Sequence, residues 1–312
     1  MRILVVGAGS IGGYFGARLA HAGRDVTFLV RPGRAAALAK TGLCVISPVG
    51  DVTIAEPKLI GASEITAPFD VVLLSCKAFD LEAAMESFAP AVGPLTVILP
   101  MLNGMAHMAA LDARFGATHV LGGLCLIMST LDAEGRVRHL APGHLLSLGV
   151  RAAGLVRPVE PVAALFQGAG FDFKLNDDIE QAMWEKWMFI SIAAGLTCLA
   201  RGSIGDIIAG GGMWMIEALM AECAAILAHH ARTPGEAMMA RSRAMFTEPG
   251  SALTASMFRD LEQGGRIEAE QILGDLLAQA EGLETPVLRV AVAVVRTYEA
   301  RRAREQAAHG HA

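Results

Sequence analysis

A glycine-rich hexapeptide near the start of the chain has the composition of a dinucleotide-binding loop. Gly7-Ala8-Gly9-Ser10-Ile11-Gly12 follows an expected strand over 3–6 and opens an expected helix over 11–22. One glycine permits a tight turn, a second lets the backbone approach a pyrophosphate, and a third allows helix and strand to pack closely. The helix N-terminus adds free N–H groups and a partial positive charge. We therefore predict that these six residues bind the pyrophosphate of a dinucleotide.

The end of the second expected strand indicates which dinucleotide is bound. An NAD site usually carries an acidic residue there, whereas the strand over 25–30 ends in Arg31, with Arg34 close behind. Guanidinium groups form paired, charge-assisted hydrogen bonds with a 2′-phosphate. We therefore predict NADPH as the cofactor, with Arg31 at its 2′-phosphate. The alternative is that both arginines are ordinary solvated charges.

Lys77 and Asn103 each follow an expected strand, the first over 71–75 and the second over 96–99. Open α/β sheets bind ligands beyond the carboxyl ends of their strands. A lysine there can meet ribose or phosphate, and an asparagine amide can both donate and accept. We predict that both residues contact the cofactor. A surface lysine and an Asn-Gly turn are the simpler alternatives.

Lys186 is one of five lysines in the chain and lies between Trp184 and Trp187, at the expected mouth of an apolar helix. A protonated ammonium can donate to a carbonyl oxygen that gains negative charge as hydride arrives. We predict that Lys186 is a general acid. The alternative is a lysine at a helix end that extends its charge into water.

Ser256 falls on an expected helix over 252–262, and Glu268 falls in the first turn of the next helix, after Gly264-Gly265. Two helices that meet at a break can direct both side chains into one site. The hydroxyl can then hold a substrate carboxylate, and the carboxylate can orient Lys186. A satisfied helix serine and a dipole-compensating glutamate are the alternatives.

The elements that position these residues follow from the hydrophobic pattern. Apolar strands alternate with helices in the first half, with further strands over 43–47 and 120–126, which favours a doubly wound sheet. Arg136–His139 and His144–Gly149 are expected to pair as a hairpin around Pro142-Gly143. Beyond residue 176 the pattern is helical. We predict an α/β Rossmann-type domain over 1–176 and a helical domain over 177–312, with a frayed tail after Tyr298.

Composition argues against several classes of partner. The net charge is −5 and no basic block occurs, so neither nucleic acid nor an anionic membrane is expected. The apolar run over 187–200 is too short to span a membrane. Scattered cysteines and the His229-His230 pair lack metal-ligand spacing. We expect a cytoplasmic protein without a metal, whose partner is a small molecule and which could form a homodimer.

These motifs together resemble the ketopantoate reductase (2-dehydropantoate 2-reductase) family, over nearly the whole chain. The resemblance implies a Rossmann domain and a helical domain with the active site in the cleft, NADPH as cofactor, and a role in pantothenate biosynthesis. It also implies that Lys186 is the catalytic lysine and that Asn103, Ser256 and Glu268 bind substrate. The segments that carry it are the opening through Arg31, Ser75-Cys76-Lys77-Ala78, Leu102-Asn103-Gly104-Met105, Trp184-Glu185-Lys186-Trp187, Ser256-Met257 and Glu268.

Three positions depart from the family pattern. Its asparagines four and eight residues after the lysine are Ile190 and Ala194 here, and the one three residues before the serine is Leu253. An apolar pocket does not select for a substrate hydroxyl. We therefore expect an NADPH-dependent 2-keto acid reductase, with ketopantoate as the first candidate and a more apolar 2-keto acid as the alternative. A non-catalytic NADPH sensor is a third hypothesis, against which the retained Lys186 and Glu268 argue.

Overall fold

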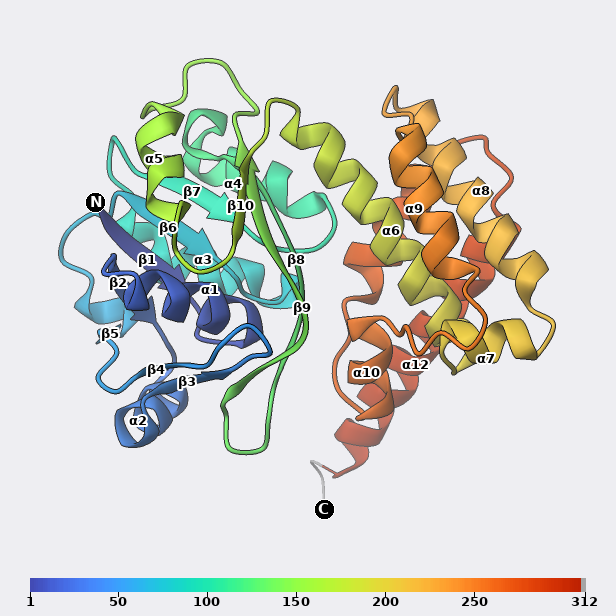
Figure 1. Ribbon diagram of the computed structural model, residues 1–312, viewed down its shortest axis with the longest axis horizontal. Coiled ribbons are helices and arrows are strands. Elements are labelled where there is room, and N and C mark those ends of the chain that lie inside the picture. Colours follow the sequence, from blue (N-terminus) through green and yellow to red (C-terminus); the bar gives the residue numbers. More distant parts are fainter. Residues whose placement is uncertain (310–312) are drawn as a thin grey trace. The chain divides into compact units, whose positions relative to one another are not determined.

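The computed structural model describes residues 1–309, and its contacts divide the chain into two units. The first unit comprises Met1–Leu102 and His107–Glu180. The second comprises Asn103–Ala106 together with the residues from Gln181 onward. An α/β unit is therefore followed by a helical one (Figure 1), which confirms the predicted fold class.

A parallel five-stranded sheet lies at the centre of the first unit, in the order β5-β2-β1-β6-β7. Its strands are runs of valine, isoleucine and leucine because helices and loops cover both faces; all four residues of β6 and of β7 are buried. The strand order reverses beside β1, so ligands are expected at the carboxyl ends of β1 and β6. The strands are β1 (Arg2–Val6), β2 (Asp25–Leu29), β5 (Leu59–Ile60), β6 (Val71–Leu74) and β7 (Val97–Pro100).

A second, mixed sheet contains the largest difference from the sequence-based expectation. Arg136–His139 and His144–Gly149 do not form a hairpin with each other; Val137–His139 and His144–Gly149 belong to one strand, β9, which pairs antiparallel with β8. The register shifts opposite Ile127, so Pro142-Gly143 lies in a bulge of one long strand and not in a turn. The strands of this sheet are β3 (Leu43–Ile46), β4 (Val52–Ile54), β8 (Gly122–Leu131), β9 (Val137–Gly149) and β10 (Asp172–Leu175).

Helix α1, which begins in the glycine-rich loop, is tied to the second sheet by buried polar groups. Tyr14 Oη lies 2.6 Å from His144 Nδ1, and the Arg18 guanidinium donates to the Gly50 carbonyl at 2.6 Å. Both α1 side chains are buried, and hydrogen bonds away from water are stronger and hold geometry better. The helix that carries the loop is thus fixed in place. The helices of this unit are α1 (Ser10–His21), α2 (Pro32–Thr41), α3 (Leu81–Phe88), α4 (Ala106–Phe115) and α5 (Val159–Phe166).

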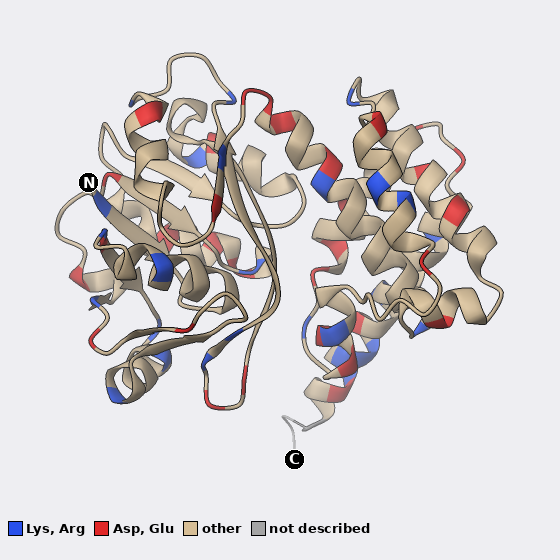
Figure 2. Cartoon of the chain, viewed as in Figure 1, with Lys and Arg blue, Asp and Glu red and all other residues tan. Residues whose placement is uncertain are grey.

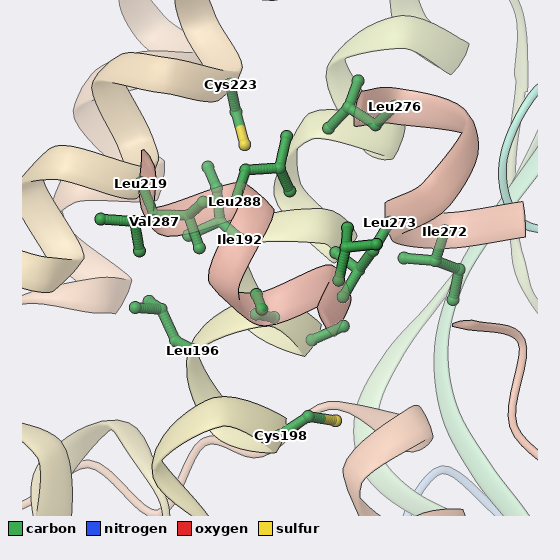
Figure 3. Packing of buried hydrophobic residues seen from close by; sticks show 14 of the residues in the cluster. Ile192, Leu196, Cys198, Leu219, Cys223, Ile272, Leu273, Leu276, Val287 and Leu288 are labelled. Carbon is green, nitrogen blue, oxygen red and sulfur yellow. The ribbon is translucent and has the colours of Figure 1, made fainter. Parts of the chain in front are cut away.

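The helical unit packs around one apolar core. Figure 3 shows side chains of α6, α8, α12 and the turn before α11 gathered in it, among them Ile192, Leu219 and Leu288. The apolar run over 187–200 forms the inner part of α6, and most of its residues are buried. The elements are α6 (Ile179–Ala200), α7 (Ile204–Ala209), α8 (Met213–His229), α9 (Glu236–Phe246), α10 (Ser256–Glu262), a π turn (Glu270–Gly274), α11 (Asp275–Ala278) and α12 (Pro286–His309).

The chain beyond Tyr298 does not fray in the described range, contrary to the prediction. Helix α12 continues to His309, and residues 310–312 lie outside the described range. Basic and acidic residues are interleaved along its last turns (Figure 2). One such pair, Arg301 and Glu305, lies four residues apart with 3.7 Å between Nε and Oε1, and pairs at this spacing support a helix.

Candidate active site

The glycine-rich loop between β1 and α1 has a backbone suited to a pyrophosphate. Gly7 has a φ of 90°, which glycine adopts at little cost. A Cβ at Gly12 would collide with the Ser75 side chain and the Gly7 carbonyl, so a glycine there permits close packing of helix on strand. A Cβ at Gly9 would meet no atom within 4 Å. The backbone at Gly9 is therefore open to a ligand, and the loop fits the cofactor predicted for it.

Two side chains that the sequence did not assign to the loop hold it in shape. Ser75 Oγ donates to the Val6 carbonyl at 2.8 Å. Arg34 Nε donates to the Ala8 carbonyl at 3.0 Å and Nη1 donates to the Gly135 carbonyl at 2.9 Å. Partial burial lowers the pKa of the Arg34 guanidinium below its ordinary value. Arg34 therefore braces the loop.

Arg31 and Lys77 are exposed side chains near the same edge of the parallel sheet. Arg31 immediately precedes α2, and its Nη2 lies 3.2 Å from Oδ2 of Asp80, with 75% of the Arg31 side chain exposed. An ion pair this exposed contributes little, so an incoming phosphate can take the guanidinium. Lys77 lies three residues past β6, which runs beside β1 with Leu74 opposite Val6. Both cations thus follow the carboxyl ends of β2 and β6, the two strands that flank β1, and the glycine-rich loop begins at the end of β1.

Lys186 lies two turns inside α6 and not at its mouth, because α6 begins at Ile179. Its neighbours along the helix are anchored: the Trp184 ring stacks on His230 with 5.3 Å between centroids, and Trp187 Nε1 donates to the Ile272 carbonyl at 2.9 Å. Lys186 itself is partly buried. Within residues 1–309, no hydrogen bond or ion pair engages its ammonium. The helix is held on either side of a cation whose donors are available to a ligand.

A π turn connects α6 to the segment that carries Asn103. The carbonyl of Ile272, inside this turn, accepts from Trp187 Nε1 and also from Ser191 Oγ at 3.0 Å. The neighbouring carbonyl of Gln271 lies so close to Gly104 that a Cβ there would collide with it, and Gly104 has a φ of 79°. Such turns are frequent at functional sites. The same π turn therefore contacts both Gly104, which follows Asn103, and α6, which carries Lys186.

The structure moves Ser256 from the middle of a helix to its first residue. Helix α10 begins at Ser256 and not at residue 252, because residues 251–255, which follow Pro249-Gly250, have no regular structure. Ser256 is exposed, whereas Glu268 is only 5% exposed. The Glu268 carbonyl accepts from the Ile272 amide at 3.1 Å, which places Glu268 at the N-terminal end of the helix that contains the π turn. Both residues thus stand at helix starts in the helical unit.

No group of three or more histidine, cysteine, aspartate or glutamate side chains within residues 1–309 is placed to hold a metal ion. Over the same residues, no helix combines the length and the apolar composition that crossing a membrane requires.

Comparisons with known proteins cover both units. Residues 3–150 match a family model described as ketopantoate reductase PanE/ApbA, and residues 178–299 match the model of the C-terminal domain of that family.

Individual relatives match over their full length. A Bacillus subtilis protein named uncharacterized oxidoreductase YkpB is 36% identical over 96% of this chain and 99% of its own. The 2-dehydropantoate 2-reductase of Mesorhizobium japonicum is 27% identical over 95% of this chain and 97% of its own. The crystal structure of 2-dehydropantoate 2-reductase from Geobacter metallireducens superposes with a TM-score of 0.83 and 32% identity, over 95% of this chain and 99% of that one.

Proposed function

Because this chain belongs to the ketopantoate reductase family, we propose that it reduces the C2 carbonyl of a small 2-keto acid with NADPH as the hydride donor. Gly7–Gly12 would hold the pyrophosphate, Arg31 the 2′-phosphate, and Lys77 and Asn103 other parts of the cofactor. Residues 1–176 would thus serve the cofactor, and residues 177–312, with Asn103, the substrate. The observation that carries the proposal is the unpaired ammonium of Lys186 on a helix anchored on both sides.

Reduction of the C2 carbonyl requires one proton at the carbonyl oxygen. As the C2 carbon accepts hydride, its oxygen gains negative charge, and the Lys186 ammonium donates a proton to that oxygen, which yields a 2-hydroxy acid. Asn103, Ser256 and Glu268 would position the substrate, with Ser256 as a hydroxyl donor to its carboxylate. NADPH oxidation followed with a panel of 2-keto acids tests the proposal, and a purified protein that oxidises NADPH with none of them contradicts it.

Ketopantoate is the first substrate to test, and it would place the protein in pantothenate biosynthesis in the cytoplasm. A more apolar 2-keto acid is a second candidate because of three residues. Ile190 and Leu253 are partly buried and pack against the helical core, and Ala194 is 1% exposed. None of the three can bond a substrate hydroxyl.

We predict that Ile190→Asn, alone or with Ala194→Asn, raises the preference for ketopantoate over trimethylpyruvate about tenfold. The two acids differ by one hydroxyl, and a site that bonds a hydroxyl discriminates for it where an apolar site does not. The measurement is the ratio of kcat/KM for the two substrates. Because a buried asparagine without a partner destabilises a protein, the single variant is the safer one. A wild type that already prefers ketopantoate strongly, with no gain in either variant, contradicts the prediction.

Cofactor selectivity provides a separate prediction. NADPH should bind at least about tenfold more tightly than NADH, or about 1.4 kcal/mol, and Arg31→Ala should remove most of that preference while NADH affinity stays nearly constant. Asp80→Asn should tighten NADPH, because it frees the guanidinium from its 3.2 Å ion pair and removes a negative charge near the phosphate. Fluorescence titration of both cofactors measures these affinities. Equal wild-type affinities for NADPH and NADH would defeat the assignment of Arg31.

A further inference from the structure

Arg259 lies one helical turn after Ser256, and its side chain folds back toward the start of α10. Nη1 lies 3.1 Å from the carbonyl of Thr254 and 3.4 Å from its hydroxyl oxygen. The side chain is partly buried. The guanidinium therefore lies against Thr254, two residues before the serine that we propose to contact substrate.

Arg259, like Arg34, has no carboxylate partner, unlike some arginines of comparable burial. Arg151 and Arg157 are paired with carboxylates, at 3.0 Å from Asp112 and 2.7 Å from Asp70. Among residues 1–309, no carboxylate lies within ion-pair distance of Arg259. Burial lowers the pKa of its guanidinium below the ordinary value, partly offset by nearby Asp260. A partly desolvated cation without a counter-charge is costly, and an anionic ligand would relieve that cost.

The start of α10 is attached to the face of α6 that carries Lys186. The Ala255 amide lies 3.5 Å from Oγ1 of Thr197 on α6. Thr197 follows Lys186 by eleven residues, which at 100° per residue places the two on the same side of the helix. Arg259 and Lys186 thus lie on two helices of the helical unit that are in contact, and neither has a carboxylate partner within residues 1–309.

We propose that Arg259, together with Ser256, binds the carboxylate of the substrate and makes the enzyme specific for free 2-keto acids over their esters. This inference rests on the proposed function. A guanidinium fork matches a carboxylate and forms charge-assisted hydrogen bonds with it. Arg259 would fix the substrate by its carboxylate end, irrespective of the side chain that the pocket prefers.

The test compares a 2-keto acid with its methyl ester in Arg259→Gln and Arg259→Lys. Arg259→Gln should raise KM for the acid about ten- to hundredfold, the range for loss of a charged hydrogen bond, and leave KM for the ester within about threefold. Arg259→Lys should fall between wild type and Arg259→Gln, because it keeps the charge and loses the fork. Arg289→Gln, which removes an exposed arginine from α12 of the same unit, should match the wild type.

A folded Arg259→Gln protein with an unchanged acid-to-ester ratio overturns the inference and leaves the proposed function standing. A wild type that reduces no 2-keto acid rejects the proposed function instead. In that case oxamate, an unreactive 2-keto acid analogue, still tests Arg259 through a thermal-shift titration in the presence of NADPH. Saturable stabilisation of the wild type that is lost in Arg259→Gln supports the inference; equal responses, or none in either protein, overturn it.

Discussion

Replacement of Lys186 by alanine is expected to lower kcat for a 2-keto acid by about 10²–10⁴, the usual contribution of a positioned proton donor. The affinity for NADPH should barely change, because the glycine-rich loop belongs to the other unit of the chain. The Lys186 side chain makes no polar contact within residues 1–309, so its removal should cost little stability. Stopped-flow single turnovers would show whether the loss lies in the chemical step.

Two further variants separate proton donation from charge and from folding. Lys186→Arg should also be severely impaired, because arginine keeps the charge but does not readily release a proton. Lys174→Ala removes an exposed lysine from β10 and should retain wild-type turnover. A folded Lys186→Ala enzyme that turns over within about threefold of wild type would reject the assignment, since threefold is well under 1.4 kcal/mol of barrier. The acid would then have to be sought elsewhere, first at Lys77.

The sequence was sufficient for the parts of the fold that depend on local pattern. A strand that is buried on both faces is a continuous apolar run, which made β1, β6 and β7 recognisable. The hairpin error shows the limit of the same reasoning. Pro142-Gly143 is a strong turn signal, yet β8 supplies a long partner strand, and the structure absorbs the dipeptide as a bulge. Pairing along the whole length of a neighbouring strand overrides a local turn preference when it satisfies more backbone groups.

In the candidate site, too, local sequence pattern predicted some features and not others. Residue types and spacing were enough to select Gly7–Gly12 and Lys186, whose roles depend mainly on the element they occupy. The supporting contacts could not be predicted, because Arg34 reaches Ala8 across 26 positions and Trp187 reaches Ile272 across 85. The sequence does show that Arg259 follows Ser256 by three residues. This spacing indicates a binding role only when the structure shows that no carboxylate pairs with Arg259 within residues 1–309.

The glycine-rich loop allows a prediction with a closely matched control. Gly9→Ala is expected to weaken NADPH binding about hundredfold, or about 2.7 kcal/mol, the scale of a lost charge-assisted hydrogen bond. A Cβ at Gly9 meets no protein atom within 4 Å, so the variant should fold normally, and the methyl group would instead occupy space that the pyrophosphate requires. Isothermal titration with NADPH measures the affinity, and thermal unfolding without cofactor measures the stability.

Gly33→Ala and Gly12→Ala are the controls for Gly9→Ala. Gly33 also has open space at its Cβ position, but it lies in α2, where alanine favours the helix; this variant should bind NADPH normally and be slightly more stable. Gly12→Ala should lose both binding and stability, because its Cβ would collide with the Ser75 side chain and the Gly7 carbonyl. The protein leaves room for a methyl group at both Gly9 and Gly33. A difference in NADPH affinity between the two alanine variants would therefore come from a ligand bound at the loop. If Gly9→Ala binds NADPH as tightly as Gly33→Ala does, the pyrophosphate does not lie against this loop.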